Sequence, residues 1–376
     1  MQAPSMVEPW IPRLIAAWRR LRGSAVGERS LTAEERRDVV AGAQRLSHGL
    51  TRERELAGAR YFEDPQLLGA YLLLYWPVSY AQAASVLREV GGGHGRVLDV
   101  GSGPGPLALA ALDAGATGAL AIDRSAAALD VARSLAGAGA VTLETARWEP
   151  SRPLPDGPFD LVLAGHVLNE LYGDDLAARA ALVEAMLART APGGLVVLIE
   201  PALRETSRAL LQLRDRLVAA GATVRAPCLY RGGCPALARP TDWCHAERPW
   251  TPPPLVDELA HAAKLHRETL KMSYLVLQAP GAAWPPLPEG RLFRIVSEPL
   301  PQKGQHRYVG CGPEGRVPLV LPEKHVRDAN RTFTTLARGE VISVDRLTPR
   351  GDGLRLDDQS RVEKIADADA PVAPKK

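Results

Sequence analysis

Apolar positions recur at helical spacing through the first 90 residues. In the segment LTAEERRDVVAGAQRL, Thr32 is followed three residues later by Glu35, the capping pattern that marks the start of a helix. The segment QLLGAYLLLYWPVSYAQAASVLREV supplies another apolar helix, interrupted near Pro77. The pattern therefore predicts a helical N-terminal region over residues 1–90.

After the glycine-rich GGGHG at residues 91–95, short apolar runs alternate with helical stretches. The runs are RVLDVG, GALAID, AVTLETA, FDLVLAGHVLNEL and GGLVVLIEP, and LKMSYLVLQ closes the series. This alternation is typical of a doubly wound parallel sheet. It predicts a Rossmann-like α/β domain over residues 91–283, with a cysteine-rich insertion at 224–250.

From residue 284 the sequence pattern predicts short strands separated by Gly and Pro turns. The strands are RLFRIVSEPL, QHRYVGCGP, RVPLVLP and EVISVDRL. We expect a small β module over 284–357, barrel-like and built of five strands. The tail at 358–376 is expected to be disordered.

Composition narrows the class of protein. The 376 residues are 46% hydrophobic and 24% charged, and no apolar stretch is long enough to cross a bilayer. Lys+Arg number 46 against 43 Asp+Glu, a net charge of +3, so any basic surface must be local. We expect a cytoplasmic monomer that binds neither DNA nor membranes, in a compartment where thiols stay reduced.

A glycine turn follows the first strand of the α/β domain. The segment RVLDVGSGPGPLALAAL places Asp99 before Gly101, Gly103 and Gly105, and Asp123 ends the next strand. A carboxylate beside the turn would repel a pyrophosphate but suits an ammonium group, and Asp123 could accept both ribose hydroxyls. These features favour S-adenosylmethionine (SAM) over a nicotinamide dinucleotide or an empty turn.

With the downstream runs, this turn resembles that of the class I SAM-dependent methyltransferases over about residues 90–280. The segment AGHVLNEL lacks the Asn/Asp-Pro-Pro-aromatic run of enzymes that methylate exocyclic amines. His166, Asn169 and Glu170 are weak candidates for catalysis, with His166 as a base. Asn169 and Glu170 could instead cap the next helix, so enzymatic activity stays uncertain from the sequence.

Four cysteines form a second constellation: Cys228, Cys234 and Cys244 in one loop, and Cys311 in the β module. Structural zinc sites usually begin with a shorter Cys-x2–4-Cys spacing, whereas iron–sulfur ligands follow varied spacings. The residue types leave open a [4Fe–4S] cluster, a zinc site that includes His245, and ordinary buried thiols.

The cysteine loop with its DWCH run and the later GQHRYVGCGPEGR resemble the methyltransferase-like family of the mitochondrial small ribosomal subunit and its bacterial relatives. The resemblance reaches from the SHGLTRERELAGARYF segment to about residue 350. It implies an assembly factor of the small subunit that binds its rRNA and carries a [4Fe–4S] cluster on Cys228, Cys234, Cys244 and Cys311.

Basic residues in the β module offer a candidate RNA surface. Between residues 284 and 346, ten Lys/Arg face seven Asp/Glu, a net charge of +3. The expected contacts are Lys303, His306 and Arg307 in one hairpin, and Lys324, Arg327, Arg331 and Arg338 on a helix. Two other functions remain open: a non-catalytic RNA-binding assembly factor with a vestigial SAM pocket, and a small-molecule methyltransferase with a zinc site.

Overall fold

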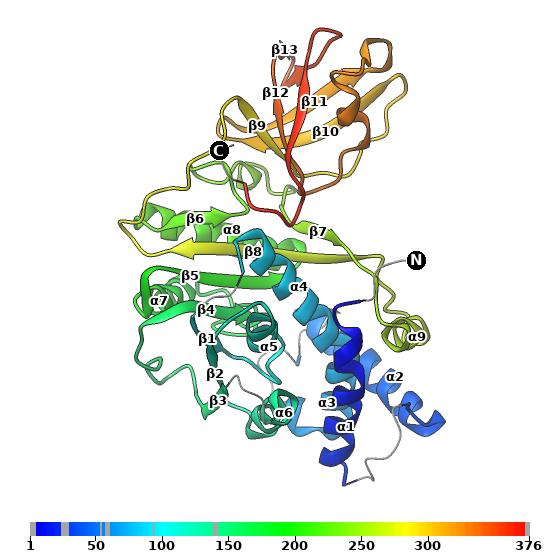
Figure 1. Cartoon of the computed structure of the whole chain (residues 1–376), viewed down its shortest axis with the longest axis vertical. Coiled ribbons are helices and arrows are strands. Elements are labelled where there is room, and N and C mark those ends of the chain that lie inside the picture. Colours follow the sequence, from blue (N-terminus) through cyan, green and yellow to red (C-terminus); the bar gives the residue numbers. More distant parts are fainter. Residues whose placement is uncertain are drawn as a thin grey trace. The chain divides into compact units, whose positions relative to one another are not determined.

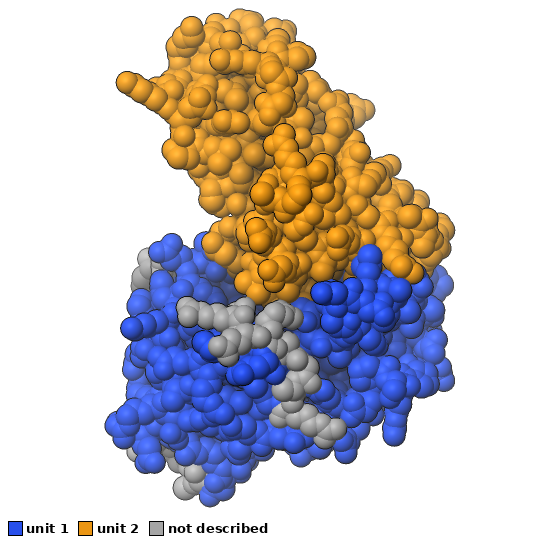
Figure 2. Space-filling model, turned by 180° about the vertical axis from the view of Figure 1, so that it is seen from behind, with its two compact units in different colours: residues 1–87, 92–199, 249–270 blue, residues 88–91, 200–248, 271–376 orange. Residues whose placement is uncertain are grey.

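The computed structural model describes residues 5–23, 30–52, 55–56, 61–92, 95–137 and 142–372. The chain divides into two compact units, coloured separately in Figure 2. Unit 1 comprises residues 1–87, 92–199 and 249–270, and unit 2 comprises residues 88–91, 200–248 and 271–376. The cysteine loop and the C-terminal β module thus lie in the same unit.

Unit 1 is built on a parallel sheet in the order β3-β2-β1-β4-β5 (Figure 1). The pattern of apolar runs predicted this doubly wound, Rossmann-like arrangement correctly. Because the strands are parallel, the carboxyl ends of β1, β2 and β4 meet at one edge, where such sheets bind ligands. The strands are β1 (Arg96–Val100), β2 (Gly118–Asp123), β3 (Thr142–Arg147), β4 (Phe159–Gly165) and β5 (Thr190–Pro201).

Helices follow the strands of unit 1 and fill its N-terminal region. Helix α5 packs on β1, β2 and β4, and α6 packs on β2 and β3. Helices α1, α2 and α3 group together beside the sheet (Figure 1). The helices are α1 (Ile11–Leu21), α2 (Ala33–Ser47), α3 (Pro65–Ala70), α4 (Trp76–Glu89), α5 (Pro106–Asp113), α6 (Ala126–Ala136), α7 (Leu176–Leu187) and α9 (Pro254–Ala262), with short turns at Glu8–Trp10, His48–Arg52 and Tyr61–Glu63.

Two local features of these helices follow from the sequence. Thr32 accepts a hydrogen bond from Glu35 N (3.2 Å), and Glu35 accepts one from Thr32 N (2.7 Å), which confirms the predicted capping box at α2. Between α3 and α4 the chain forms one π-helical turn, Tyr71–Tyr75. The predicted interruption lies here, because Pro77 is the second residue of α4 and cannot donate to the preceding turn.

Unit 2 begins with helix α8 (Arg204–Ala219) and three strands that flank the cysteine loop. Strand β8 (Thr269–Gln278) pairs with β7 (Ala246–Pro249) and antiparallel with β6 (Thr223–Ala226). The cysteine loop connects β6 to β7 and contains one short helical turn, Pro235–Leu237.

The C-terminal part of unit 2 is a mixed sheet of seven strands in the order β13-β14-β11-β10-β9-β12-β15. The expectation of five strands is therefore wrong in number. Its core consists of apolar side chains such as Phe293, Tyr308 and Phe333. The strands are β9 (Arg291–Ile295), β10 (Gln305–Gly312), β11 (Gly315–Pro322), β12 (Val341–Val344), β13 (Thr348–Arg350), β14 (Gly353–Arg355) and β15 (Val362–Ala366).

The tail expected to be disordered over residues 358–376 contains β15, so that prediction is wrong for its described part. β15 pairs antiparallel with β12, and Val362 is buried in the same core as Phe293. The single helix expected after residue 324 is also wrong. Two short turns, Glu323–His325 and Arg331–Thr335, stand in its place.

Candidate functional site

The first candidate site lies where β1 turns into α5. Asp99 at the end of β1 is buried, and its Oδ2 accepts a hydrogen bond from Ala108 N in α5 (3.0 Å). Burial raises the pKa of Asp99 to about 7; the Ala108 N–H opposes this shift, and the charge of Asp123 adds to it. An uncompensated carboxyl group at this position is suited to a cationic ligand.

The three glycines of the turn all have positive φ, between 51° and 74°. A Cβ on Gly101 would lie 2.4 Å from Val167 Cγ2, and one on Gly103 would lie 3.1 Å from Phe62 Cε2. Gly105 forms the left-handed residue at which α5 begins. Glycine is therefore required here, because the backbone has positive φ and a side chain would clash. The turn leaves backbone without side chains at the edge of the sheet.

Asp123 at the end of β2 is tied to this turn. Its Oδ2 accepts from Gly103 N (2.9 Å) and its Oδ1 accepts from Ser125 N (2.8 Å). Burial raises its pKa, although these backbone N–H groups oppose the shift. A carboxylate has about four acceptor positions, and the N–H groups of Gly103, Ser125 and Arg124 occupy three, so Asp123 retains capacity for about one hydroxyl donor.

Aromatic side chains from the N-terminal region border the glycine turn. Tyr61 and Phe62 are in ring contact (4.4 Å), and Phe62 contacts Tyr71 edge-on (4.9 Å). Burial and the charge of Glu170 raise the pKa of Tyr61, which keeps the phenol protonated. The sequence interpretation overlooked Tyr61 and Phe62; the YFEDP run directly before α3 was the available signal.

The three catalytic candidates follow β4. Tyr61 donates to Glu170 Oε1 (3.3 Å), and Asn169 donates to the carbonyl oxygen of His166 (2.8 Å). Neither Asn169 nor Glu170 caps the next helix, because Asp175 provides the N-cap of α7. Glu170 therefore lies with Asp99 and Asp123 around Tyr71, since the charges of all three carboxyls raise its pKa.

His166 is partly buried with φ +60°, and its Nε2 lies 3.1 Å from Gln82 Oε1. Burial, and secondarily the charge of Arg267, lowers the pKa of His166 to about 4. The imidazole is therefore neutral at physiological pH and holds a proton weakly, which makes it a poor general base.

The four cysteines form the second candidate site, and unit 2 brings them together. Burial, followed by the charges of Cys228, Cys244 and Cys234, raises the pKa of Cys311. Burial and the charge of Cys228 likewise raise the pKa of Cys234 to about 12. The thiols are thus close enough to repel one another as thiolates. Cys311 on β10 therefore lies near the three cysteines of the loop, although it is far from them in sequence.

Arginines surround these thiols and oppose their repulsion. The pKa of Cys244, raised by burial and by Cys228, is lowered by Arg316, Arg338 and Arg294. Arg294 stands opposite Cys311 in the pairing of β9 with β10. Cationic side chains on several sides are suited to a centre that is anionic when four thiolates bind it.

Two arginines of α8 also order the cysteine loop. Arg214 donates to the carbonyl oxygens of Tyr230 (2.7 Å) and Gly232 (2.5 Å), and Asp215 accepts from Cys234 N (2.8 Å). Arg208 donates to the carbonyl oxygens of Arg239 (2.9 Å) and Asp242 (2.5 Å). The sequence interpretation missed these residues, because carbonyl contacts at long range leave no local signal.

The spacing of donor atoms bears on which metal centre the loop could hold. Among the described residues, no three of the four thiols and His245 have donor atoms within 4.8 Å of one another. Tetrahedral zinc holds its thiolates about 3.8 Å apart, given bonds of about 2.3 Å. A cubane, whose four thiolates bind four separate irons, requires wider spacing. The buried Nε atoms of Arg214 and Arg294 lack hydrogen-bond partners among the described residues, so donors remain for an anionic cluster.

The basic residues expected to bind RNA differ in their availability. Arg327 and Arg331 are paired with Asp358 (3.8 Å) and Asp328 (2.9 Å). Arg338 is largely buried, 3.2 Å from Glu298 and 3.4 Å from Glu247. Arg327 and Arg331 are exposed but paired, whereas Lys303 and Lys324 are exposed and have no carboxylate partner among the described residues.

None of the helices in the described part of the chain is long and apolar enough to cross a membrane.

Comparison with known proteins adds a family match. The family model described as "Mitochondrial small ribosomal subunit Rsm22" matches residues 69–354. No curated protein shows significant similarity to the chain.

Solved structures show distant similarity. A SAM-dependent methyltransferase from Leishmania major is 14% identical, with 64% of this chain and 82% of that chain covered and a TM-score of 0.39. The N-methyltransferase NodS from Bradyrhizobium japonicum, solved with S-adenosyl-L-homocysteine, is 14% identical, with coverage of 61% and 97% and a TM-score of 0.38. A SAM-dependent methyltransferase from Mesorhizobium loti is 21% identical, with coverage of 54% and 98% and a TM-score of 0.33. At this level of similarity no substrate can be transferred to the chain.

Proposed function

Because the chain belongs to the Rsm22 family of the mitochondrial small ribosomal subunit, we propose that it is a SAM-dependent, methyltransferase-like protein with a [4Fe–4S] cluster, acting in small-subunit assembly or rRNA methylation. Its proposed partners are the small subunit and its rRNA, with no DNA or membrane partner. Action as a monomer and a location in the cytoplasm remain predictions.

The observation that carries this proposal is the carboxyl-lined glycine turn of unit 1. SAM presents a sulfonium, an ammonium and two ribose hydroxyls but no phosphate. Asp99 and Glu170 supply negative charge beside the turn, and Asp123 supplies an acceptor for one of the hydroxyls. Gly101, Gly103 and Gly105 leave room for the ligand to approach the backbone.

Isothermal titration with SAM, followed by tritium transfer from labelled SAM to small-subunit rRNA, tests this function. Asp123→Ala should weaken SAM binding at least tenfold, because it removes acceptors and also frees the Gly103 N–H. Label in the rRNA that disappears with Asp123→Ala supports methylation. Unchanged affinity in Asp123→Ala would place the pocket elsewhere.

The burial and low pKa of His166 favour the second candidate, a non-catalytic assembly factor whose pocket binds SAM without transferring its methyl group. In that case SAM binds and no tritium reaches the rRNA. Glu170 accepts a hydrogen bond from Tyr61, and in this second candidate it would orient a bound molecule rather than deprotonate it.

For the metal centre we propose Cys228, Cys234, Cys244 and Cys311 as ligands of the cluster. When bound, the cluster would supply iron–sulfur bonds that join the loop to β10. The supporting observations are that Cys228 raises the pKa of each of the other three thiols, and that arginines surround them. Protein purified without oxygen should contain about four iron and four sulfide per chain and show broad visible absorbance. Stoichiometric zinc without sulfide would establish the zinc alternative instead.

We propose that Lys303 and Lys324 contact rRNA phosphates. Replacing both with Ala should reduce the slope of log binding constant against log salt by about two, one per lost phosphate contact. Lys364→Ala is the matched control, because Lys364 is engaged by Glu340 (3.1 Å) and Asp367 (2.7 Å). Absence of any salt-dependent RNA binding in the unmodified protein would support a small-molecule methyltransferase.

A further inference from the structure

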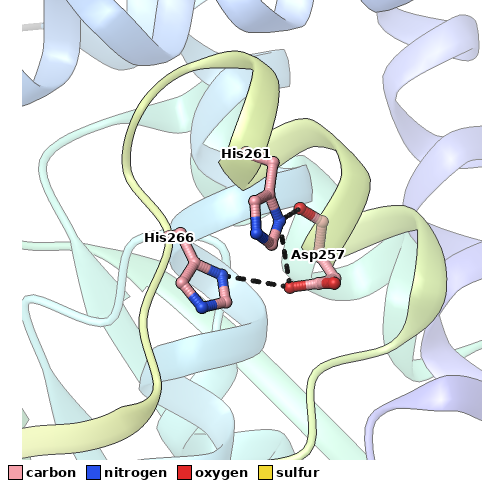
Figure 3. Close-up of side chains that lie close together, drawn as sticks. All are labelled: Asp257, His261 and His266. Carbon is pink, nitrogen blue, oxygen red and sulfur yellow. Dashed lines mark hydrogen bonds and ion pairs between the residues drawn. The ribbon is translucent and has the colours of Figure 1, made fainter.

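Three side chains with metal-binding groups gather at the end of α9 in unit 1: Asp257, His261 and His266 (Figure 3). Each offers one ligand atom, and these atoms lie within 4.8 Å of one another. In the part of the chain that the structure describes, no other set of three His, Cys, Asp or Glu meets this distance. The group uses no residue of the glycine turn or the cysteine loop.

The path of the chain explains how the three residues meet. Asp257 and His261 are four residues apart on α9 and therefore share one face of the helix. Lys264 adopts φ +59°, and Leu265 N donates to Ala260 O (2.8 Å), which turns the chain back beside the last helical turn. His266 thereby returns to the side chain of Asp257.

The distances within the group fit ligands of a shared ion better than direct ion pairs. His266 Nδ1 lies 3.3 Å from Asp257 Oδ1, whereas a charge-assisted hydrogen bond is usually about 2.7–2.9 Å long. Two ligands of tetrahedral zinc, each bonded at about 2.0–2.1 Å, lie about 3.3 Å apart. Both imidazoles present Nδ1 to the same carboxylate oxygen, since His261 Nδ1 lies 3.4 Å from Asp257 Oδ1.

The Nδ1 of His261 also lies 2.9 Å from the carbonyl oxygen of Asp257. When the ring proton is on Nε2, the lone pair of Nδ1 is free to bind a metal beside the Asp257 carboxylate. The side chains of Asp257, His261 and His266 are 40%, 56% and 39% exposed, which leaves water free to complete the coordination.

We propose that Asp257, His261 and His266 form a binding site for a divalent first-row transition ion, with zinc the expected occupant. Two imidazoles and one carboxylate suit zinc, whereas calcium and magnesium prefer all-oxygen sites. A bound ion would fasten residues 263–266 to the last turn of α9.

Titration of the full-length protein, with its cysteine centre loaded, with Co²⁺ as a spectroscopic substitute for Zn²⁺ tests the site. We expect one Co²⁺ per chain with visible d–d absorbance and no thiolate-to-metal charge-transfer band, which separates this site from the cysteines. Asp257→Asn, His261→Ala and His266→Ala should each weaken this binding at least tenfold. Glu258→Gln is the matched control: it neutralises the neighbouring carboxylate, which pairs with Arg36.

The proposal is wrong if the double variant His261→Ala/His266→Ala titrates as the unmodified protein does. It is equally wrong if all bound Co²⁺ shows thiolate charge transfer, or if Glu258→Gln loses as much binding as Asp257→Asn. None of these three results depends on whether SAM binds.

Discussion

Protonation of Asp99 should make SAM binding depend on pH. Burial raises the pKa of this carboxyl to about 7, and a cationic ligand binds its ionised form. With a pKa of about 7, about 9% of the groups are ionised at pH 6 and about 91% at pH 8. The affinity for SAM should therefore rise about tenfold between these values.

The same shift affects the stability of the ligand-free protein, and its sign can be stated. The folded protein holds the Asp99 proton more tightly than the unfolded chain does, whose carboxyl titrates near pH 4. The stabilisation by this proton is complete below about pH 4 and is lost as the pH rises through about 7. SAM should therefore raise the melting temperature more at pH 8 than at pH 6.

Isothermal titration calorimetry at constant ionic strength between pH 6 and pH 8 measures the effect on affinity. Asp99→Asn should bind SAM more weakly at pH 8 and lose most of the rise in affinity, leaving only the contribution of Asp123, whose pKa is also raised by burial. Glu184→Gln, which neutralises an exposed carboxylate on α7, should behave as the unmodified protein. An affinity that stays constant from pH 6 to pH 8, or an equal rise in Asp99→Asn, would refute the reasoning.

Three further substitutions each test a contact within one of the two units. Gly101→Ala should abolish SAM binding and lower the melting temperature, because its Cβ would lie 2.4 Å from Val167 at φ +66°; normal affinity would contradict the tight turn. Arg214→Met should reduce the iron content of purified protein at least severalfold, whereas Arg216→Met, at an exposed position on the same helix, should not; equal losses would argue against a specific role. Val362→Ala should destabilise unit 2 by about 2 kcal/mol in urea unfolding, since two buried methyl groups are lost; no change would indicate an unfolded tail.

The sheet of unit 1 could be predicted because its determinants are local. A buried parallel strand reads as a short apolar run, and a glycine turn reads as closely spaced glycines after it. The positions of Asp99 and Asp123 at the ends of β1 and β2 followed from the same runs. Thr32 and Glu35 marked the start of α2 for the same reason, since a capping box involves residues only three apart.

The rest of the candidate site depends on contacts that no short window of sequence contains. Tyr61 reaches Glu170 across 109 positions, and Arg208 reaches the carbonyl of Asp242 across 34. The order of the tail depends on the pairing of β15 with β12, whereas its charged composition suggested disorder. Composition predicts whether a segment is ordered by itself, but pairing with a neighbouring strand can order a segment that would otherwise be disordered.

The hydrogen bonds from α8 to the backbone of the cysteine loop have a consequence for how the proposed cluster would be inserted. Zinc fingers remain unfolded until metal arrives, because nothing else holds their ligands. Here Arg208 and Arg214 donate hydrogen bonds to four carbonyl oxygens of the loop, and these bonds need no metal. The loop can accordingly fold before the proposed cluster is inserted, so folding and cluster insertion would be separate events.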